Sequence, residues 1–322
     1  MPTRRAALAL GLALPALAAR GARAQTGAPP LRLVVPAPPG GPTDILARVV
    51  GEKAQAALGR TVVVDNRAGA GGVIGSEVAF RAAPDGNTLV LGHNQTHASN
   101  QWMMARLPFH VVEGFTPVAR LATVHHALVV PANSPSNTLA ELVVRGQQQP
   151  VTYASSQAGS ASHVISETLA RRTGMKATHV PYRGAAPAAT DTMTGVVDFY
   201  TATFPSVSPL VRDGKLRALC IGAPARVEGF PDLPTAAEAG QPDPFVDAWF
   251  GLFAPRDTPP AVTEALSRAM LGALEDGTVG QRLGAAGFTL APQGPAAFAA
   301  FQRDEVERWR QMVELTGVKL EE

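Results

Sequence analysis

Four short loops in this sequence combine glycine with small polar side chains, and each stands between an expected strand and an expected helix. They are PAPPGGPTD (residues 36–44), GHNQTHASN (92–100), YASSQAGSASH (153–163) and YRGAAPAATD (182–191). Free backbone N–H groups and the positive end of the helix dipole make a helix N-terminus receptive to an anion. One such loop is more often plain N-capping by Ser, Thr or Asp. Four together, with few charges, predict a polar cleft suited to a small carboxylate.

Motifs of common catalytic centres are missing: the sequence has no G-x-S-x-G elbow, no H-E-x-x-H pair and no P-loop. The run RAGAGGVIG (67–75) follows an expected strand, but Ile74 occupies the place of the third glycine of the dinucleotide fingerprint. A tight turn with close strand–helix packing is the favoured interpretation, and a dinucleotide-dependent oxidoreductase is an alternative. An exported hydrolase is another, because Ser160 and His163 are close enough in sequence to meet, although no orienting acid is evident.

Metal-binding patterns are also missing. His93 and His97 are four residues apart without acidic neighbours to complete a metal set, and the adjacent His125 and His126 would face opposite sides of a strand. The single cysteine, Cys220, lies in the apolar run LRALCIGA and is expected to be a buried small hydrophobe. We expect neither a metal nor a cofactor.

The loops are positioned by short β-branched runs that alternate with longer helical patterns, which predicts βαβ units and a largely parallel sheet. The expected strands are 31–36, 61–66, 88–93, 127–131, 151–156, 177–182, 196–202 and 216–223. The expected helices include 45–59, 141–146, 164–174 and 188–195. Near the C-terminus, one helical stripe is expected to dock onto a domain. Its members are Phe298, Phe301, Val306, Trp309 and Val313.

Length and composition indicate a folded chain. The 322 residues correspond to about two domains and are enough to bury a sizeable core. With 46% hydrophobic and 17% charged residues, the chain is not of the intrinsically disordered class.

The first 24 residues have the layout of an export signal. Arg4 and Arg5 precede an apolar run at 6–19, and the sequence around Ala24 predicts cleavage after that residue, by the Sec or the twin-arginine route. Removing this segment leaves 28 − 4 = 24 basic against 26 acidic residues, a net charge of −2 instead of +2. Such a chain has no basic surface for nucleic acid, and no later segment is apolar for long enough to span a membrane. We expect a soluble protein outside the cytoplasm.

Several motifs, taken in order, carry a family resemblance. They are PAPPGGPTD, VDNRAGAGGVIG, APDGNTL, YASSQAGSASH, VPYRGAAPAATD, GVVDF, WFGLFAP and the ending FQRDEVERWRQMVELTGVKLEE. Together they resemble the tripartite tricarboxylate transporter receptor family, the Bug family of periplasmic solute-binding proteins. The resemblance extends from about residue 31 to residue 320.

The resemblance implies an α/β, two-lobed "Venus flytrap" of the type II periplasmic binding class, with a βαβ sheet in each lobe. Lobe one would comprise residues 25–123 plus 246–322, and lobe two residues 124–245. Such a receptor closes on a small carboxylate, which could be a di- or tricarboxylate, an aromatic acid or an acidic amino acid. It then delivers the ligand to membrane transporter subunits, or, as an orphan receptor, serves a sensor protein. The resemblance implies a periplasmic monomer that does not insert into the membrane.

The resemblance also transfers candidate ligand-binding residues from the loops. They are Pro38, Gly40, Gly41, Thr43, Asp44, Thr96, His97, Ser155, Ser156, Gln157, Gly159, Ser160, His163, Tyr182, Arg183 and Asp198. A carboxylate beside an anionic ligand is repulsive, so Asp44 is expected to cap its helix, and Asp198 to orient a loop or accept from a ligand amine or hydroxyl. Arg183 is either the partner of a second carboxylate or a solvated surface residue.

This chain departs from the family pattern around the expected pocket. Ala37 replaces an aromatic residue and Gln157 replaces a glycine. Other departures are Ser99, Gln101, Thr201 and Ala202. The sequence therefore predicts the fold and the class of protein but leaves the ligand open.

Overall fold

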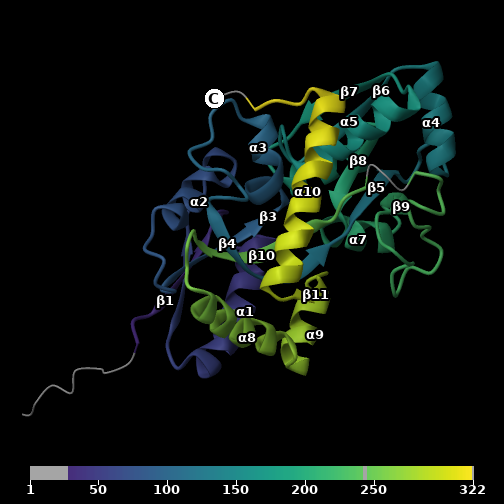
Figure 1. Cartoon of the computed structure of the whole chain (residues 1–322). Helices are drawn as coiled ribbons and strands as arrows, with labels where there is room; N and C mark the ends of the chain where they lie inside the picture. The colour runs from purple at the N-terminus through teal and green to yellow at the C-terminus, as the bar shows by residue number, and fades with distance from the viewer. Residues whose placement is uncertain (1–27, 242–244, 321–322) are drawn as a thin grey trace, which may run out of the picture.

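Two β-sheets, each flanked by helices, divide the protein into two lobes (Figure 1). The structure is a computed structural model that describes residues 28–241 and 245–320, so the predicted export signal at residues 1–24 lies outside the described residues. We call the part with the six-stranded sheet lobe one and the part with the five-stranded sheet lobe two. The two-lobed α/β architecture expected from the sequence is confirmed.

Lobe one takes its elements from both ends of the chain. Its strands are β1 (Leu31–Val35), β2 (Val62–Asn66), β3 (Thr88–His93), β4 (Phe115–Val124), β10 (Ala248–Pro255) and β11 (Thr289–Gln293). Its helices are α1 (Pro42–Leu58), α2 (Val73–Phe80), α3 (Asn100–Met103), α8 (Pro260–Leu274), α9 (Gly277–Ala285) and α10 (Pro295–Thr316), with a 3-10 turn η1 (Ala70–Gly72) and a π-turn η2 (Gln95–Ser99).

Lobe two is built from the middle of the chain. Its strands are β5 (His126–Pro131), β6 (Val151–Ser155), β7 (Ala177–Pro181), β8 (Phe199–Thr203) and β9 (Leu216–Ile221). Its helices are α4 (Leu139–Gln148), α5 (Ala161–Thr173), α6 (Ala185–Met193) and α7 (Phe204–Arg212). Within the described parts of the chain, no helix combines the length and apolar character that a membrane crossing requires.

The expectation of a largely parallel sheet is wrong, because each sheet is mixed. The strand orders are β11-β4-β10-β3-β1-β2 in lobe one and β7-β6-β8-β5-β9 in lobe two. β1 pairs in parallel with β2 and β3, and β6 with β7 and β8, as the βαβ pattern predicts. β4, β5 and β10 lie next to the points where the chain passes between lobes, and they pair antiparallel to their neighbours.

The two crossings between the lobes lie side by side. β4 ends at Val124 and β5 begins at His126, while the return segment leads into β10 at Ala248. His125 Nδ1 contacts Asp247 Oδ1 at 2.8 Å, and His126 Nδ1 donates to the Val246 carbonyl at 2.8 Å. The predicted boundaries at 123/124 and 245/246 fall on these segments and stay a prediction.

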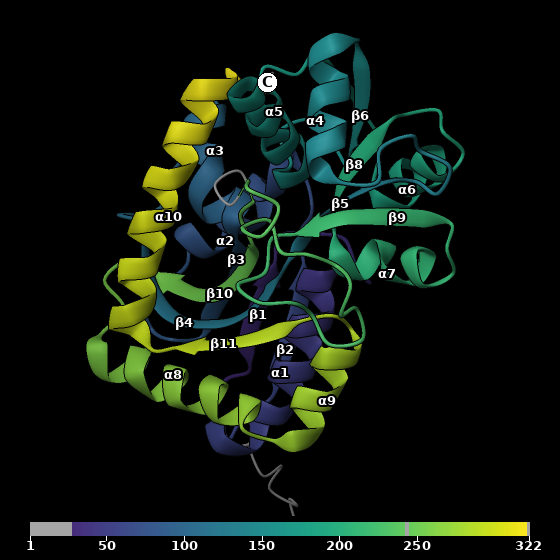
Figure 2. The ribbon, with the colours of Figure 1, turned by 90° about the vertical axis from the view of Figure 1, so that its right-hand side faces the viewer.

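The C-terminal helix α10 runs along both lobes (Figure 2). The apolar stripe expected on it is confirmed, because Phe298, Val306, Trp309 and Val313 are buried and Phe301 packs against the same core. That core also contains side chains of α5 in lobe two. One large aromatic buried in such a core contributes on the order of 2–3 kcal/mol. Through this shared core, α10 joins lobe one to lobe two.

Two other sequence expectations are confirmed. Cys220 is a buried free cysteine. The RAGAGGVIG segment is a tight turn against β1, because a Cβ placed on Gly75 would lie 2.7 Å from Pro36 Cα and 2.7 Å from the Arg67 carbonyl oxygen. Only a glycine permits this approach of the two backbones.

Candidate functional site

A cavity of about 190 Å³ lies between the two lobes. Lobe one contributes residues from the start of α1, the end of β3 and the start of β10, and lobe two contributes residues from the loops before α5, α6 and α7. The lining residues are Pro42, Thr43, His93, Asn94, Gln95, His126, Ser156, Ala161, Ser162, Ala185, Tyr200, Thr203, Ala248 and Phe250. Among the described residues, the lining contains no Asp, Glu, Lys or Arg, so none of their carboxylates repels an anion there.

Four helices begin at this cavity. The first residues of α1, α5 and α6 line it, as does Thr203, the N-cap of α7. Ser160 caps α5 by accepting from the His163 backbone N–H, whereas no side chain caps α1, α6 or α7. A helix N-terminus carries a partial positive charge on its unpaired N–H groups. The cavity is therefore neutral in side-chain charge but positive in backbone potential.

A buried amide donor at the cavity has no partner. Asn94 lines the cavity and is buried, and its Nδ2 forms no hydrogen bond within the described residues. An unmade hydrogen bond of this kind costs roughly 1–3 kcal/mol. Such a group in a native fold calls for an acceptor, and this one lies where the helix N-termini meet.

A network of serine hydroxyls fixes the lobe-two side of the cavity. The Ser156 backbone N–H donates to Ser162 Oγ at 3.0 Å, and the Ser160 and Ser162 hydroxyls are 2.8 Å apart. Ser160 Oγ also donates to the Gln157 carbonyl at 2.7 Å. These bonds hold Ser156 and Ser162 at the cavity wall. Because the Ser160 proton goes to the Gln157 carbonyl, the Ser162 hydroxyl donates to Ser160, which leaves the Ser156 hydroxyl to donate to a ligand.

Two histidines on the lobe-one side are neutral near pH 7. Burial lowers the pKa of His93, a lining residue, to about 4. Burial likewise lowers the pKa of His97 well below its usual value, and its ring stacks on Phe253 at 4.1 Å between centroids. Thr96 Oγ1 contacts His97 Nδ1 at 2.9 Å. Thr96 and His97 are thus buried behind the cavity, while His93 faces it.

Of the residues predicted in the first loop, the structure places Thr43 on the cavity lining. Pro38 and Gly40 are exposed and Gly41 is the N-cap of α1. Asp44 accepts from the Gly40 N–H at 2.9 Å and from Arg48 Nε at 3.0 Å. The bond from Arg48 is the main reason that the pKa of Asp44 is lowered to about 2. The expectation that Asp44 caps its helix is wrong, because Gly41 is the N-cap of α1 and Asp44 binds the Gly40 N–H before the helix, outside the cavity lining.

The residues predicted in the lobe-two serine loop divide in the same way. Ser156 lines the cavity, whereas Ser155 Oγ donates to the Gln157 carbonyl at 2.9 Å and contacts His179 Nε2 at 2.6 Å. His163 Nδ1 accepts from the Gly159 N–H at 3.1 Å, and its ring stacks on His179. Ser160 is bonded to the His163 backbone and to other loop atoms rather than to the imidazole. The Ser160–His163 pair of the hydrolase alternative is therefore not arranged as nucleophile and base.

Other predicted residues lie outside the lining. Asp198 accepts from Arg145 Nη2 and from the Thr152 N–H, and so joins α4 to the adjoining strands. The Tyr182 hydroxyl donates to Asp191 at 2.8 Å, and Arg183 is exposed. Gln157 is exposed and reaches across to lobe one, where its Nε2 donates to Gln95 Oε1 at 3.3 Å.

Sequence reasoning missed lining residues, mainly Asn94, Gln95, Tyr200 and Phe250. Asn94 and Gln95 stand in the GHNQTHASN loop, from which Thr96 and His97 were expected instead. The backbone there forms the π-turn η2. A π-turn has more residues per turn than an α-helix, so the residues that share a face differ from those that α-helical spacing predicts. The polar composition of this loop predicts that it contributes to the site, but helical spacing does not predict which of its residues face the cavity.

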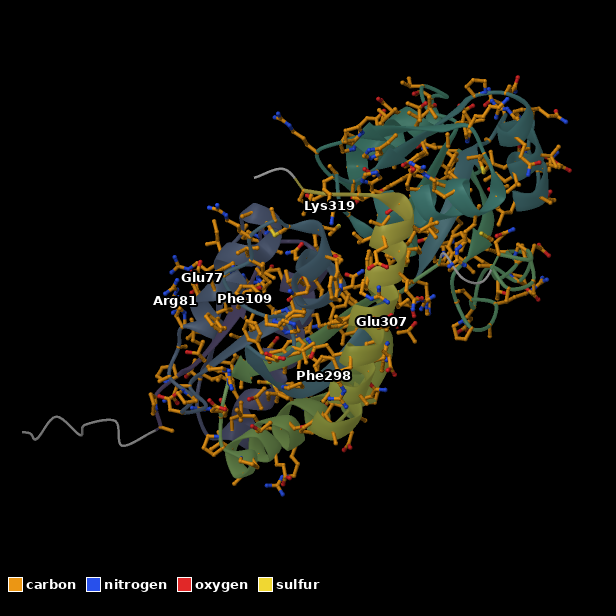
Figure 3. The ribbon with its side chains drawn as sticks, turned by 45° about the horizontal axis from the view of Figure 1, so that its top comes forward. Glu77, Arg81, Phe109, Phe298, Glu307 and Lys319 are labelled. Carbon is orange, nitrogen blue, oxygen red and sulfur yellow. The ribbon has the colours of Figure 1, made fainter. Side chains whose placement is uncertain are left out.

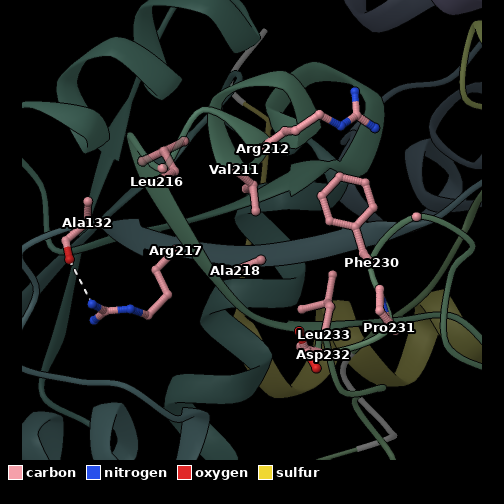
Figure 4. Close-up of a pocket in the computed structure, with 12 residues that line it drawn as sticks. Ala132, Val211, Arg212, Leu216, Arg217, Ala218, Phe230, Pro231, Asp232 and Leu233 are labelled. Carbon is pink, nitrogen blue, oxygen red and sulfur yellow. Dashed lines mark hydrogen bonds between the residues drawn. The ribbon is translucent and has the colours of Figure 1, made fainter.

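Larger hollows elsewhere suit a ligand less well. One of about 500 Å³ lies within lobe two, where Arg217 already donates to the Ala132 carbonyl (Figure 4). Another of about 890 Å³ also lies between the lobes, beside the crossing segments, where His125 is paired with Asp247 and Arg226 with Glu238. The 190 Å³ cavity differs from both because it combines an unpartnered buried amide N–H donor with several helix N-termini.

Comparisons with known proteins agree with this geometry. The sequence model of the tripartite tricarboxylate transporter family receptor matches residues 46–318. Protein BugT of Bordetella pertussis is 37% identical over 294 residues, which is 90% of each chain. MatC from Rhodopseudomonas palustris with bound malate is 33% identical with a TM-score of 0.74, covering 88% of this chain and 98% of its own. An R. palustris protein with adipate is 30% identical with a TM-score of 0.79, covering 90% of this chain and 97% of its own.

Proposed function

The chain belongs to the tripartite tricarboxylate transporter receptor family of periplasmic solute-binding receptors, and from this premise we propose that it binds a small dicarboxylate in the cavity between its lobes. The observation that carries the proposal is the buried Asn94 amide, which lacks an acceptor where helix N-termini converge. A carboxylate supplies that acceptor and the negative charge that the backbone potential favours.

A ligand with two carboxylates suits this cavity because each lobe contributes hydrogen-bond donors to it. On lobe one, Thr43 and Asn94 offer donors beside the start of α1. On lobe two, the Ser156 hydroxyl offers a donor beside the start of α5. A dicarboxylate that spans the cavity would engage both lobes, and the malate and adipate bound by the two similar structures are dicarboxylates. The small volume of about 190 Å³ favours a short acid over a large one.

Binding through both lobes explains how the receptor would respond to its ligand. The ligand stabilises the closed arrangement only to the extent that it binds that arrangement more tightly than the open one. A monocarboxylate would satisfy one lobe and leave the donors of the other unpaired. We therefore expect it to bind much more weakly and to promote less closure.

The proposal extends to export and delivery. The export signal at residues 1–24, cleaved after Ala24, would place the protein in the periplasm as a soluble monomer. The closed receptor would then present its ligand to membrane transporter subunits. Size-exclusion chromatography and mass spectrometry of protein recovered from the periplasm would check the cleavage site and the monomeric state.

Calorimetric titration of residues 25–322 tests the ligand class. The panel pairs malate, succinate and adipate with the corresponding monoamides, so that each pair differs in one carboxylate. We expect at least one diacid to bind at least about tenfold more tightly than its monoamide, because loss of a charged hydrogen-bonding group costs roughly 1.5–3 kcal/mol. Equal affinities within every pair, or no binding by any diacid, would contradict the proposal.

A further inference from the structure

Leu320, the last described residue, touches the loop that builds the lobe-two side of the cavity. Gly159 lies in the segment 156–160 between β6 and α5, which we call the serine loop, and is buried with φ +71°. A Cβ placed on Gly159 would lie 2.5 Å from Leu320 Cδ2 and 3.0 Å from Leu320 Cγ. The Leu320 side chain therefore rests directly on the glycine backbone.

Leu320 itself is fastened to lobe one. Its backbone N–H donates to the Met103 carbonyl at 3.0 Å, at the end of α3. The preceding Lys319 donates through Nζ to the Trp102 carbonyl at 2.8 Å, and the Trp102 indole donates to the Val306 carbonyl in α10. Figure 3 labels Lys319 on the segment that follows α10, where the lobes approach each other. The last described residue is thus a lobe-one group in contact with a lobe-two loop.

A continuous set of hydrogen bonds leads from Gly159 to the cavity. The Gly159 N–H donates to His163 Nδ1, and the adjacent Ser160 is bonded to Gln157 and Ser162. Ser162 in turn accepts from the Ser156 N–H, and both of these serines line the cavity. This network therefore connects Gly159 to Ser156 and Ser162 at the cavity wall.

The serine loop is held to lobe one at a second place. Gln157 Nε2 donates to Gln95 Oε1 at 3.3 Å, and Gln95 lines the cavity from lobe one. The two contacts lie two residues apart in the serine loop: Gly159 meets Leu320, and Gln157 meets Gln95 on the cavity side. A movement that separates this loop from lobe one has to break both.

We propose that Leu320 is a positioning residue for the ligand site: by packing on Gly159 it fixes the serine loop against lobe one and slows release of the bound acid. This inference rests on the proposed dicarboxylate function. Leu320 would thus influence ligand binding without contacting the ligand. The packing is apolar, so its effect should not depend on the charge of the acid.

The first test compares Leu320→Ala with Leu315→Ala, a matched control whose side chain is 43% exposed on α10. Stopped-flow measurement of release of the tightest diacid should show about five- to tenfold faster release from Leu320→Ala, within the range of typical coupling between sites. Leu315→Ala should release at the wild-type rate, and Leu320→Met, which keeps an apolar contact of similar size, should restore slow release. Release from Leu320→Ala at the wild-type rate would overturn the inference.

Gly159→Ala alone and combined with Leu320→Ala provides a second, directional test. The added methyl meets Leu320 in the single variant, and the double variant relieves that clash while keeping the backbone strain. We expect the double variant to bind the diacid more tightly than Gly159→Ala alone. A double variant that binds no better would show that Leu320 does not act on Gly159.

Hydrogen exchange of the unliganded protein separates this inference from the proposed function. Amides of residues 156–160 should exchange faster in Leu320→Ala than in Leu315→Ala, while β1 exchanges equally in both. Wild-type protein that binds no diacid would refute the proposed function, and the exchange result would still decide whether Leu320 holds the serine loop. Equal exchange of that loop in both variants would refute the positioning role.

Discussion

Stability should fall as the pH drops below neutrality because of buried histidines. Burial, with a smaller contribution from His179, lowers the pKa of His163 to about 4, and burial lowers that of His93 to about 4. A histidine in the unfolded chain titrates near 6.5. Between these values the unfolded state binds more protons than the folded state, so the free energy of unfolding rises with pH. This contribution is fully present above about pH 6.5 and is lost as the pH falls through about 4.

The size of the effect follows from the pKa difference. A change from 6.5 to about 4 is worth about 3 kcal/mol in full, and lowering the pH from 7.5 to 5 removes about 2 kcal/mol of it for one histidine. Replacing His163 by Gln removes this group while keeping an acceptor for the Gly159 N–H. The variant should lose about 2 kcal/mol less stability than wild type over the same pH interval.

Urea unfolding followed by tryptophan fluorescence at pH 7.5, 6 and 5 measures both proteins. His110→Gln serves as the control for replacing an exposed histidine. If wild type and His163→Gln lost the same stability between pH 7.5 and 5, the buried, neutral state assigned to His163 would be wrong.

Three further substitutions test the packing and the cap. Trp309→Ala empties a fully buried site between α10 and the core and should cost about 3–5 kcal/mol of unfolding free energy in urea, whereas a cost under about 1 kcal/mol would contradict the packing. Gly75→Ala should cost about 1–3 kcal/mol in thermal denaturation, because its methyl would meet the Pro36 and Arg67 backbones, and an unchanged midpoint would show that the turn is looser. Ser160→Ala removes the N-cap of α5 and should lower stability by about 1 kcal/mol and weaken diacid binding in calorimetry, while Thr138→Ala, which removes the N-cap of α4 outside the cavity lining, should leave binding unchanged.

Local sequence patterns were sufficient for the βαβ halves of both lobes. β1, β3 and β6 begin at the expected residues because continuous β-branched runs specify buried parallel strands. The patterns did not identify the antiparallel strands β10 and β11, since pairing direction depends on where the chain re-enters a lobe. That property is set by contacts between segments far apart in sequence and leaves no local trace.

The sequence was sufficient to predict which loops form the candidate site, but not which side chains in them line the cavity. Thr43 and Ser156 were expected because small polar residues before a helix indicate its N-terminus, and both line the cavity. Asp198 was carried over from the family motif, yet its side chain is bound to Arg145 outside the cavity lining. Asn94 was missed because its importance lies in an unpaired amide, which depends on the burial of its surroundings and on the π-turn that follows.

The affinity of the tightest diacid for Asn94→Asp, measured by calorimetry beside wild type, tests the central claim most directly. The substitution keeps the shape of the side chain but replaces a buried donor by a carboxylate facing an anion. Asn133→Asp adds the same charge at an exposed position of lobe two and serves as the control. We predict at least about tenfold weaker binding by Asn94→Asp and wild-type affinity for Asn133→Asp. Wild-type affinity in Asn94→Asp would contradict the placement of the ligand between the lobes.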